Sequence, residues 1–203
     1  MPKTIRNVFD KSLTFIKLLE SYNRVKKGKN NKEILEFSID LETNLINILN
    51  NLKNNTYKIG KYREFKIYEP KERIIKSLPF KDRIVQDFYI NEFIKLYIIP
   101  RFIKDSYSCI EGRGTHKCVE TTQKYMRKMY NKYGNYYILK CDIKKFFYNI
   151  DKDILYNIMS KYITDEKVLN LTYIFIYDNS DKVSIPSSEI TRVSTFLIYT
   201  CMN

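Results

Sequence analysis

Apolar residues recur at helical spacing through much of the chain. Residues 4–27 carry them three or four positions apart, which predicts one helix followed by a basic loop. Asn31 suits the N-cap of a second helix, because its side chain can accept a hydrogen bond from a first-turn N–H. Residues 80–99 predict a further helix that Pro100 ends. The apolar positions expected in these helices are Ile5, Val8, Phe9, Leu13, Ile16, Leu19, Ile34, Leu35, Leu41, Leu45, Ile46, Leu49, Ile84, Val85, Phe88, Phe93, Ile94 and Tyr97.

Residues 62–78 alternate between apolar and polar positions instead, which predicts a β-hairpin with Pro70 in its turn. Lys66, Lys71, Arg73 and Lys76 add positive charge to this hairpin. They can project toward a common ligand, such as a triphosphate or a nucleic-acid backbone. The alternative is a basic hairpin that is merely exposed to solvent.

A loop around residues 104–114 precedes another predicted helix. Gly112 and Gly114 flank Arg113, and glycine allows the backbone to approach a ligand closely. Thr115 suits the N-cap of a helix that runs to about Tyr133. His116 is the only histidine, and we interpret it as a loop or first-turn residue without a catalytic partner.

Residues 136–151, which read YYILKCDIKKFFYNID, begin as an apolar segment typical of a buried strand and place Asp142 at its end. A rigid strand end can hold a metal-binding carboxylate in position. The alternative for Asp142 is a carboxylate that makes a turn hydrogen bond. Asp151 suits the cap of a following helix, and Thr164 or Asp165 suits the start of another that runs to about residue 177.

The composition of the chain indicates which class of binding partner to expect. The 203 residues carry a net charge of +13, with 18 Tyr and 12 Phe interleaved among the cations. Positive charge favours polyanions, and aromatic rings can stack on bases, so we expect nucleic acid as the partner rather than a membrane. No apolar run reaches eighteen residues, no secretory signal is recognisable, and the four cysteines lack CxxC spacing. We therefore expect a cytoplasmic protein with reduced thiols.

Four blocks in order resemble the reverse transcriptases of bacterial retroelements, a group that includes group II introns, retrons and diversity-generating retroelements. Residues 65–86 resemble the basic fingers hairpin and the helix after it, and residues 104–118 resemble a serine–tyrosine and glycine-rich stretch. Residues 136–151 resemble the first palm motif, and residues 183–186, VSIP, resemble the start of a GxPxG motif.

The resemblance implies an RNA-directed DNA polymerase with Mg²⁺ or Mn²⁺ as cofactor, and with an RNA template, a DNA primer and deoxynucleoside triphosphates as partners. Asp142 matches the first catalytic metal carboxylate, and the carbonyl of Ile143 matches a backbone metal ligand. Phe147 matches the aromatic residue that excludes ribonucleotides. Lys71 and Arg73 match the positions that bind the incoming triphosphate.

Three further cations, Lys66, Arg83 and Arg113, are the candidate nucleic-acid contacts. The implied fold is α+β, with mostly helical fingers that carry a β-hairpin and an incomplete palm of a right-hand polymerase. The expected divisions are an N-terminal helical extension, fingers, a partial palm and an atypical tail; they span residues 1–60, 61–134, 135–186 and 187–203.

The chain departs from the family at its second half. The Tyr-x-Asp-Asp motif, which supplies the remaining metal carboxylates, does not occur, so we expect a fragment that binds nucleic acid and is not catalytic alone. Back-translation of residues 188–203 in a shifted frame can read GNYKSQYISNLYMYE, which contains the family's continuation after VSIP and points to a frameshift near residues 186–188. The alternatives are a nucleic-acid-binding or regulatory module derived from a reverse transcriptase, and a scaffold for protein partners.

Overall fold

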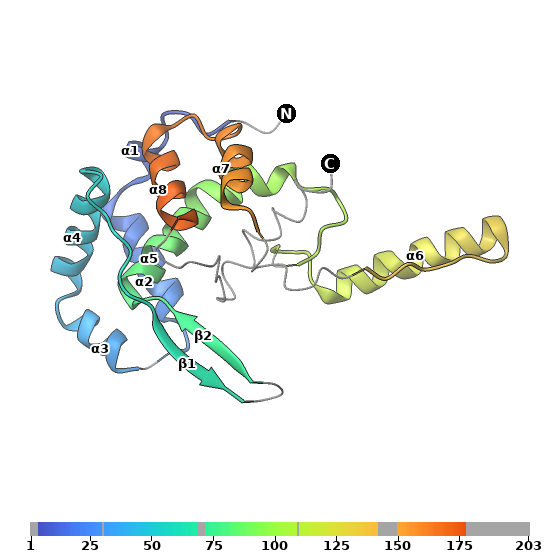
Figure 1. Ribbon diagram of the computed structural model, residues 1–203, viewed down its shortest axis with the longest axis horizontal. Helices are drawn as coiled ribbons and strands as arrows, with labels where there is room; N and C mark the ends of the chain where they lie inside the picture. The colour runs from blue at the N-terminus through green and yellow to red at the C-terminus, as the bar shows by residue number, and fades with distance from the viewer. Residues whose placement is uncertain (1–3, 30, 69–71, 109, 142–149, 178–203) are drawn as a thin grey trace.

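Two helices, α2 (Phe15–Lys26) and α5 (Phe80–Tyr89), pack against each other in the body of the molecule (Figure 1). This computed structural model describes residues 4–29, 31–68, 72–108, 110–141 and 150–177. Within these ranges, helices combine with one two-stranded antiparallel sheet, which confirms the predicted α+β class.

Apolar side chains from both ends of the described chain form one core. The largest fully buried side chains are Ile5, Phe9, Leu18, Ile34, Leu45, Phe80, Ile84, Phe88, Phe93, Ile94, Ile98 and Leu155. Phe93 makes an edge-to-face contact with Phe88 and a stacked contact with Phe9, at centroid distances of 5.6 and 5.9 Å. The N-terminal segment therefore packs directly on the central helices.

The predicted single helix over residues 4–27 is wrong, because the chain breaks at Leu13. Helix α1 (Phe9–Ser12) ends there, and the Thr14 side chain then caps α2 by accepting a hydrogen bond from the Lys17 N–H at 3.3 Å. The restart changes the helical phase, so Ile16, one of the apolar positions of the predicted helix, is 66% exposed. Two further apolar positions of the predicted helices, Leu35 and Ile46, are also exposed.

Asn31 caps α3 (Lys32–Ile39), as predicted, by accepting a hydrogen bond from the Ile34 N–H at 3.0 Å. The helix does not continue as one piece. Asp40 leaves helical geometry at ψ 48°, and α4 (Leu41–Lys53) follows it. The bend lets Ile34 and residues of α4 bury their side chains in the same core.

The predicted hairpin is confirmed. Strand β1 (Arg63–Ile67) pairs antiparallel with β2 (Arg73–Ser77), in a register that runs from Arg63↔Ser77 to Ile67↔Arg73. Every residue of β1 is exposed, and the ribbon projects from the body (Figure 1). Pro70, predicted in the turn, lies outside the described residues.

The predicted helix over residues 80–99 is present, but only its first part is α-helical. Helix α5 continues into a π-helix, η1 (Ile90–Ile98), and then into a single 3₁₀ turn, η2 (Ile99–Arg101), which contains Pro100. Both α5 and η1 contribute fully buried apolar side chains, so this continuous helical segment forms the centre of the core.

Two capped helices, α7 (Lys152–Ser160) and α8 (Glu166–Ile176), complete the body. Asp151 accepts hydrogen bonds from the first turn of α7, as predicted, and of the two predicted starts of the next helix, Thr164 and Asp165, it is Asp165 that caps α8. None of the helices in the described part of the chain is long and apolar enough to cross a membrane.

Asp165 also joins the N-terminal segment to α8. Its Oδ2 accepts hydrogen bonds from the N–H groups of Val8 and Phe9, at 2.8 and 3.0 Å. A parallel bridge between Ile5 and Ile163 lies beside this contact. The first described residues are thereby fixed to the last described helices.

Helix α6 (Thr115–Tyr133) projects away from the body and has no buried residue (Figure 1). The prediction that Thr115 caps this helix is wrong, because Thr115 is the first helical residue. Gly114 takes the cap position without a side-chain hydrogen bond. Gly134, at φ +74°, ends the helix in the left-handed region that glycine favours.

The predicted buried strand at residues 136–142 is wrong over residues 136–141, which have no strand geometry. Tyr137 is fully exposed and Leu139 is 87% exposed. A strand needs a partner for its backbone groups, and β1–β2 is the only sheet that the described residues form. Local apolar character was therefore not sufficient to form a strand.

Candidate nucleic-acid interface

The hairpin lysines Lys66, which is exposed, and Lys76, which is partly buried, are both paired with glutamates. Lys66 Nζ lies 2.9 Å from Glu72 Oε1, and Lys76 Nζ lies 2.8 Å from Glu64 Oε1. Lys66 pairs with Ile74, and Lys76 pairs with Glu64. Residues two apart on a strand point to the same face, and so do residues that pair directly across it. The antiparallel register therefore brings these two cations to one face of the ribbon.

Arg73 pairs with Ile67 at the end of the ribbon. Residues directly opposite each other share a face, and the face alternates with every residue. Because only the strand pairing of Arg73 is described, the convergence of Lys66, Arg73 and Lys76 on one ligand stays a prediction. Lys71, the fourth cation in that prediction, lies outside the described residues.

Arg83 connects two helices. Its Nη2 lies 3.1 Å from Glu33 Oε2 of α3, and its guanidinium lies 5.4 Å from the Phe80 ring centroid. Glu33 also accepts a hydrogen bond from the Phe80 N–H at the start of α5. Arg83 therefore has a structural role between α3 and α5, and its contact with nucleic acid stays a prediction.

Arg113 closes the loop before α6. Its Nη1 donates to the carbonyls of Ile103 and Lys104, at 3.4 and 3.2 Å, and its backbone N–H donates to Ile110. Gly112, at φ +73°, allows the tight turn between them. The Gly-Arg-Gly sequence thus forms a loop that its own arginine stabilises.

The predicted catalytic residues cannot be placed. Asp142, Ile143 and Phe147 lie outside the described residues, as does Lys71, and nothing is described of the Arg73 side chain. Across the described ranges, no three His, Cys, Asp or Glu side chains come close enough together to hold a metal ion.

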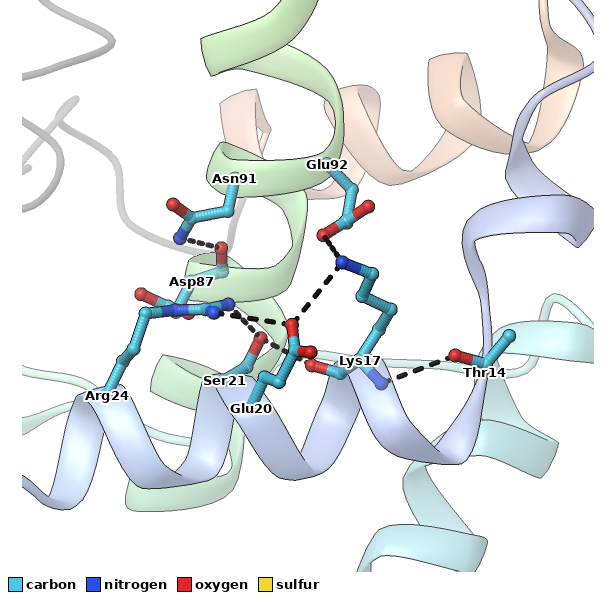
Figure 2. A network of polar contacts seen from close by, with 8 residues as sticks. All are labelled: Thr14, Lys17, Glu20, Ser21, Arg24, Asp87, Asn91 and Glu92. Atoms are coloured by element: carbon cyan, nitrogen blue, oxygen red, sulfur yellow. Dashed lines mark hydrogen bonds and ion pairs between the residues drawn. The ribbon is translucent and has the colours of Figure 1, made fainter.

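Other cations form a polar network between α2 and the α5–η1 segment (Figure 2). Arg24 Nε lies 2.8 Å from Asp87 Oδ2, and Lys17 Nζ lies 3.4 Å from Glu92 Oε1. The charge of Glu92 raises the pKa of Lys17 above its usual value. Arg24, at the start of the predicted basic loop, is therefore held by carboxylates of the body.

A groove that the sequence did not predict lies between the base of the hairpin and α8. Its volume is about 440 Å³, within the roughly 300–1,000 Å³ typical of ligand pockets. We call it the tyrosine groove. Its lining residues are Tyr57, Lys58, Ile59, Gly60, Lys61, Tyr62, Glu64, Lys76, Tyr173, Ile174 and Tyr177.

Stacked aromatic rings form one wall of the tyrosine groove. Tyr173 and Tyr177, one turn apart, have ring centroids 4.5 Å apart at an interplanar angle of 29°. Tyr156 of α7 meets both rings edge to face. The Tyr177 hydroxyl donates to Asp153, and this hydrogen bond raises the pKa of Tyr177 to about 12. Tyr173 remains 48% exposed.

A buried carboxylate fixes the opposite wall. Asp82 accepts hydrogen bonds from the Tyr57 hydroxyl at 2.8 Å and from the Gly60 N–H at 2.9 Å. Burial raises the pKa of Asp82, and burial together with the Asp82 charge raises the pKa of Tyr57. A Cβ at position 60 would lie only 2.9 Å from Pro79 Cγ, so the backbone packs closely here.

Two lysines give the tyrosine groove its net positive charge. Lys58 and Lys61 are exposed, and neither forms an ion pair within the part of the chain that the structure describes. Lys76 is matched by Glu64, so that pair adds no net charge. The sequence YKIGKY at residues 57–62 interleaves tyrosine with lysine and was the available signal for this wall.

Comparison of the sequence with models of protein families found no match, and comparison with curated proteins found none either.

Proposed function

We propose that this chain is the fingers and first part of the palm of a reverse transcriptase, and that it binds nucleic acid without polymerising alone. The observation that carries the proposal is the basic antiparallel ribbon β1–β2, which leads through two residues into the core helix α5. This is the arrangement that the resemblance implies for residues 65–86.

The charge of the ribbon suits a phosphate backbone. Lys66 and Lys76 share a face of the ribbon; the Lys66–Glu72 ion pair is exposed to solvent, and the Lys76–Glu64 pair is partly exposed. Exposed pairs contribute only about 0–1 kcal/mol, so a phosphate can replace the glutamate at small cost. With a net charge of +13, binding to a polyanion would release counterions and depend strongly on salt.

Polymerisation requires more carboxylates than this sequence offers in the family's motifs. Asp142 and the Ile143 carbonyl would hold Mg²⁺ or Mn²⁺, and two-metal phosphoryl transfer needs further carboxylates beside them. The sequence contains no Tyr-x-Asp-Asp, and the described residues form no alternative carboxylate group. We therefore propose binding, rather than catalysis, as the activity of the 203-residue polypeptide.

A pair of matched lysine variants tests the proposed binding surface. Lys66 and Lys32 are both exposed and both paired with a glutamate, Lys66 with Glu72 and Lys32 with Glu36 at 3.7 Å. Each change to glutamine removes one positive charge, so only the position differs. The measurement is the Kd of a fluorescently labelled RNA–DNA template–primer at several salt concentrations.

We expect Lys66→Gln to weaken binding and to lower the slope of log Kd against log salt by about 1, as for the loss of one phosphate contact. Lys32→Gln should leave that slope close to the wild-type value. Equal effects of the two variants would contradict a binding surface on the ribbon.

A further inference from the structure

We propose that the tyrosine groove binds an unpaired nucleotide of a single strand, with its base stacked on Tyr173 and its phosphates near Lys58 and Lys61. This inference rests on the proposed nucleic-acid-binding function and names a second contact surface for it. Base–aromatic stacking tolerates any sequence, because every base has a π-face.

Tyr173 is a rigid, accessible platform. It lines the groove and is 48% exposed, while Tyr177 stacks on it and Tyr156 meets it edge to face. The preceding residue, Thr172, is buried and bonds to the Tyr89 hydroxyl in the core at 2.7 Å. The ring is thus held before a ligand arrives, which lowers the entropic cost of stacking.

The lysines stand on a wall that is equally well fixed. Asp82 holds the backbone on both sides of Lys58, through the Tyr57 hydroxyl and the Gly60 N–H. Lys61 follows Gly60 directly. Their flexible stems can place ammonium groups beside a phosphate, and neither lysine is held in an ion pair within the described residues.

The chemistry of the groove favours an unpaired base over a duplex. Bases inside a duplex are stacked on their neighbours and present only their edges, so they cannot cover an aromatic ring. A single strand can turn a base out and stack it on tyrosine while its backbone follows positive charge. Tyr173 and the two lysines offer both contacts within one groove of about 440 Å³.

The test compares a single strand with a duplex. The probes are a labelled oligouridylate about 12 nucleotides long and a blunt RNA–DNA duplex of equal length. The variants are Tyr173→Leu, which keeps apolar volume but removes the ring, and Tyr173→Phe, which keeps the ring. Tyr133→Leu, at the exposed end of α6, is the control for loss of an exposed tyrosine.

We expect Tyr173→Leu to weaken single-strand binding about fivefold or more and to leave duplex binding unchanged. Tyr173→Phe should bind like the wild type, and the double variant Lys58→Gln/Lys61→Gln should lose single-strand affinity and salt dependence. Thermal unfolding of each variant shows whether its fold is retained.

Distinct outcomes separate the two proposals. If the wild type binds duplex with salt dependence but Tyr173→Leu has no selective effect, the groove assignment fails and the proposed function stands. If the wild type binds neither probe, both fail. If free uridine monophosphate competes as well as the strand does, the groove is a mononucleotide site and the strand assignment is overturned.

Discussion

Asp82 shows how one buried side chain positions the wall of a groove. It is fully buried at the start of α5, yet its carboxylate bonds to residues 22 and 25 positions earlier in the chain. These bonds satisfy the Tyr57 hydroxyl and the Gly60 N–H, which would otherwise be polar groups without an acceptor. The lysine-bearing wall of the tyrosine groove therefore depends on a residue that does not line it.

Replacement of Asp82 should cost stability in proportion to the acceptors that are lost. We expect Asp82→Ala to lower the free energy of unfolding by about 2–3 kcal/mol, because the buried Tyr57 hydroxyl and the partly buried Gly60 N–H lose their acceptor. Asp82→Asn keeps one acceptor and should cost about 1 kcal/mol. Urea unfolding followed by circular dichroism measures both, and equal stability of Asp82→Ala and the wild type would contradict this role.

Sequence patterns alone did not identify Asp82. An acidic residue in the first turn of a helix is ordinary, since it interacts favourably with the helix dipole. Only the tertiary fold brings residues 57–60 over it. Tyr173 and Tyr177 show the same limit: their spacing places them one turn apart, but their position opposite Lys58 depends on how α8 packs.

At the scale of the elements, Asp165 acts on two helices at once. One carboxylate oxygen caps α8, through the N–H groups of Lys167 and Val168, and the other accepts from Val8 and Phe9 at the start of α1. Asp151 is exposed and, within the described residues, caps only α7. The two aspartates can therefore be compared directly: each caps a helix, and Asp165 also bonds to the start of α1.

We expect Asp165→Ala to lower the free energy of unfolding by about 3 kcal/mol, from the lost cap and from two N–H groups left without an acceptor. Asp151→Ala should cost about 1 kcal/mol, as an exposed N-cap does. Chemical denaturation of both variants gives the comparison. A cost for Asp165→Ala no larger than that for Asp151→Ala would show that the N-terminal contact is not stabilising.

The elements differ in how well the sequence predicted them. The caps at Asn31 and Asp151 and the hairpin were predicted correctly, and the cap at Asp165 was one of two predicted starts of α8, because these signals are local. The breaks at Leu13 and Asp40 were not, since a change in helical phase follows from packing rather than from periodicity. Residues 136–141 were predicted as a strand from apolar character, which cannot supply the partner strand.

For the whole molecule, buried and hydrogen-bonded tyrosines predict a loss of stability in alkali. Burial raises the pKa values of Tyr57 and Tyr89, and the hydrogen bond to Asp153 raises that of Tyr177 to about 12. Above about pH 10 the unfolded chain releases these phenolic protons while the folded chain keeps them. The unfolded state then binds fewer protons, so stability falls as pH rises.

We therefore expect the midpoint of thermal unfolding to fall steadily from about pH 10 upward. Tyr89→Phe should make this fall less steep, because it removes one retained proton, and Thr172 keeps its bond to the Val168 carbonyl. Circular dichroism melts at a series of pH values provide the measurement. An unchanged slope in Tyr89→Phe would argue against a contribution from this tyrosine.

The salt dependence of template–primer binding is the measurement that tests the proposed nucleic-acid-binding function of this basic molecule. For the wild-type chain, we expect the affinity for an RNA–DNA template–primer to fall linearly on a log–log plot as salt rises. Several phosphate contacts would give a slope of about 0.9 per contact. Absence of binding, or an affinity that does not change with salt, would contradict the proposed nucleic-acid-binding function.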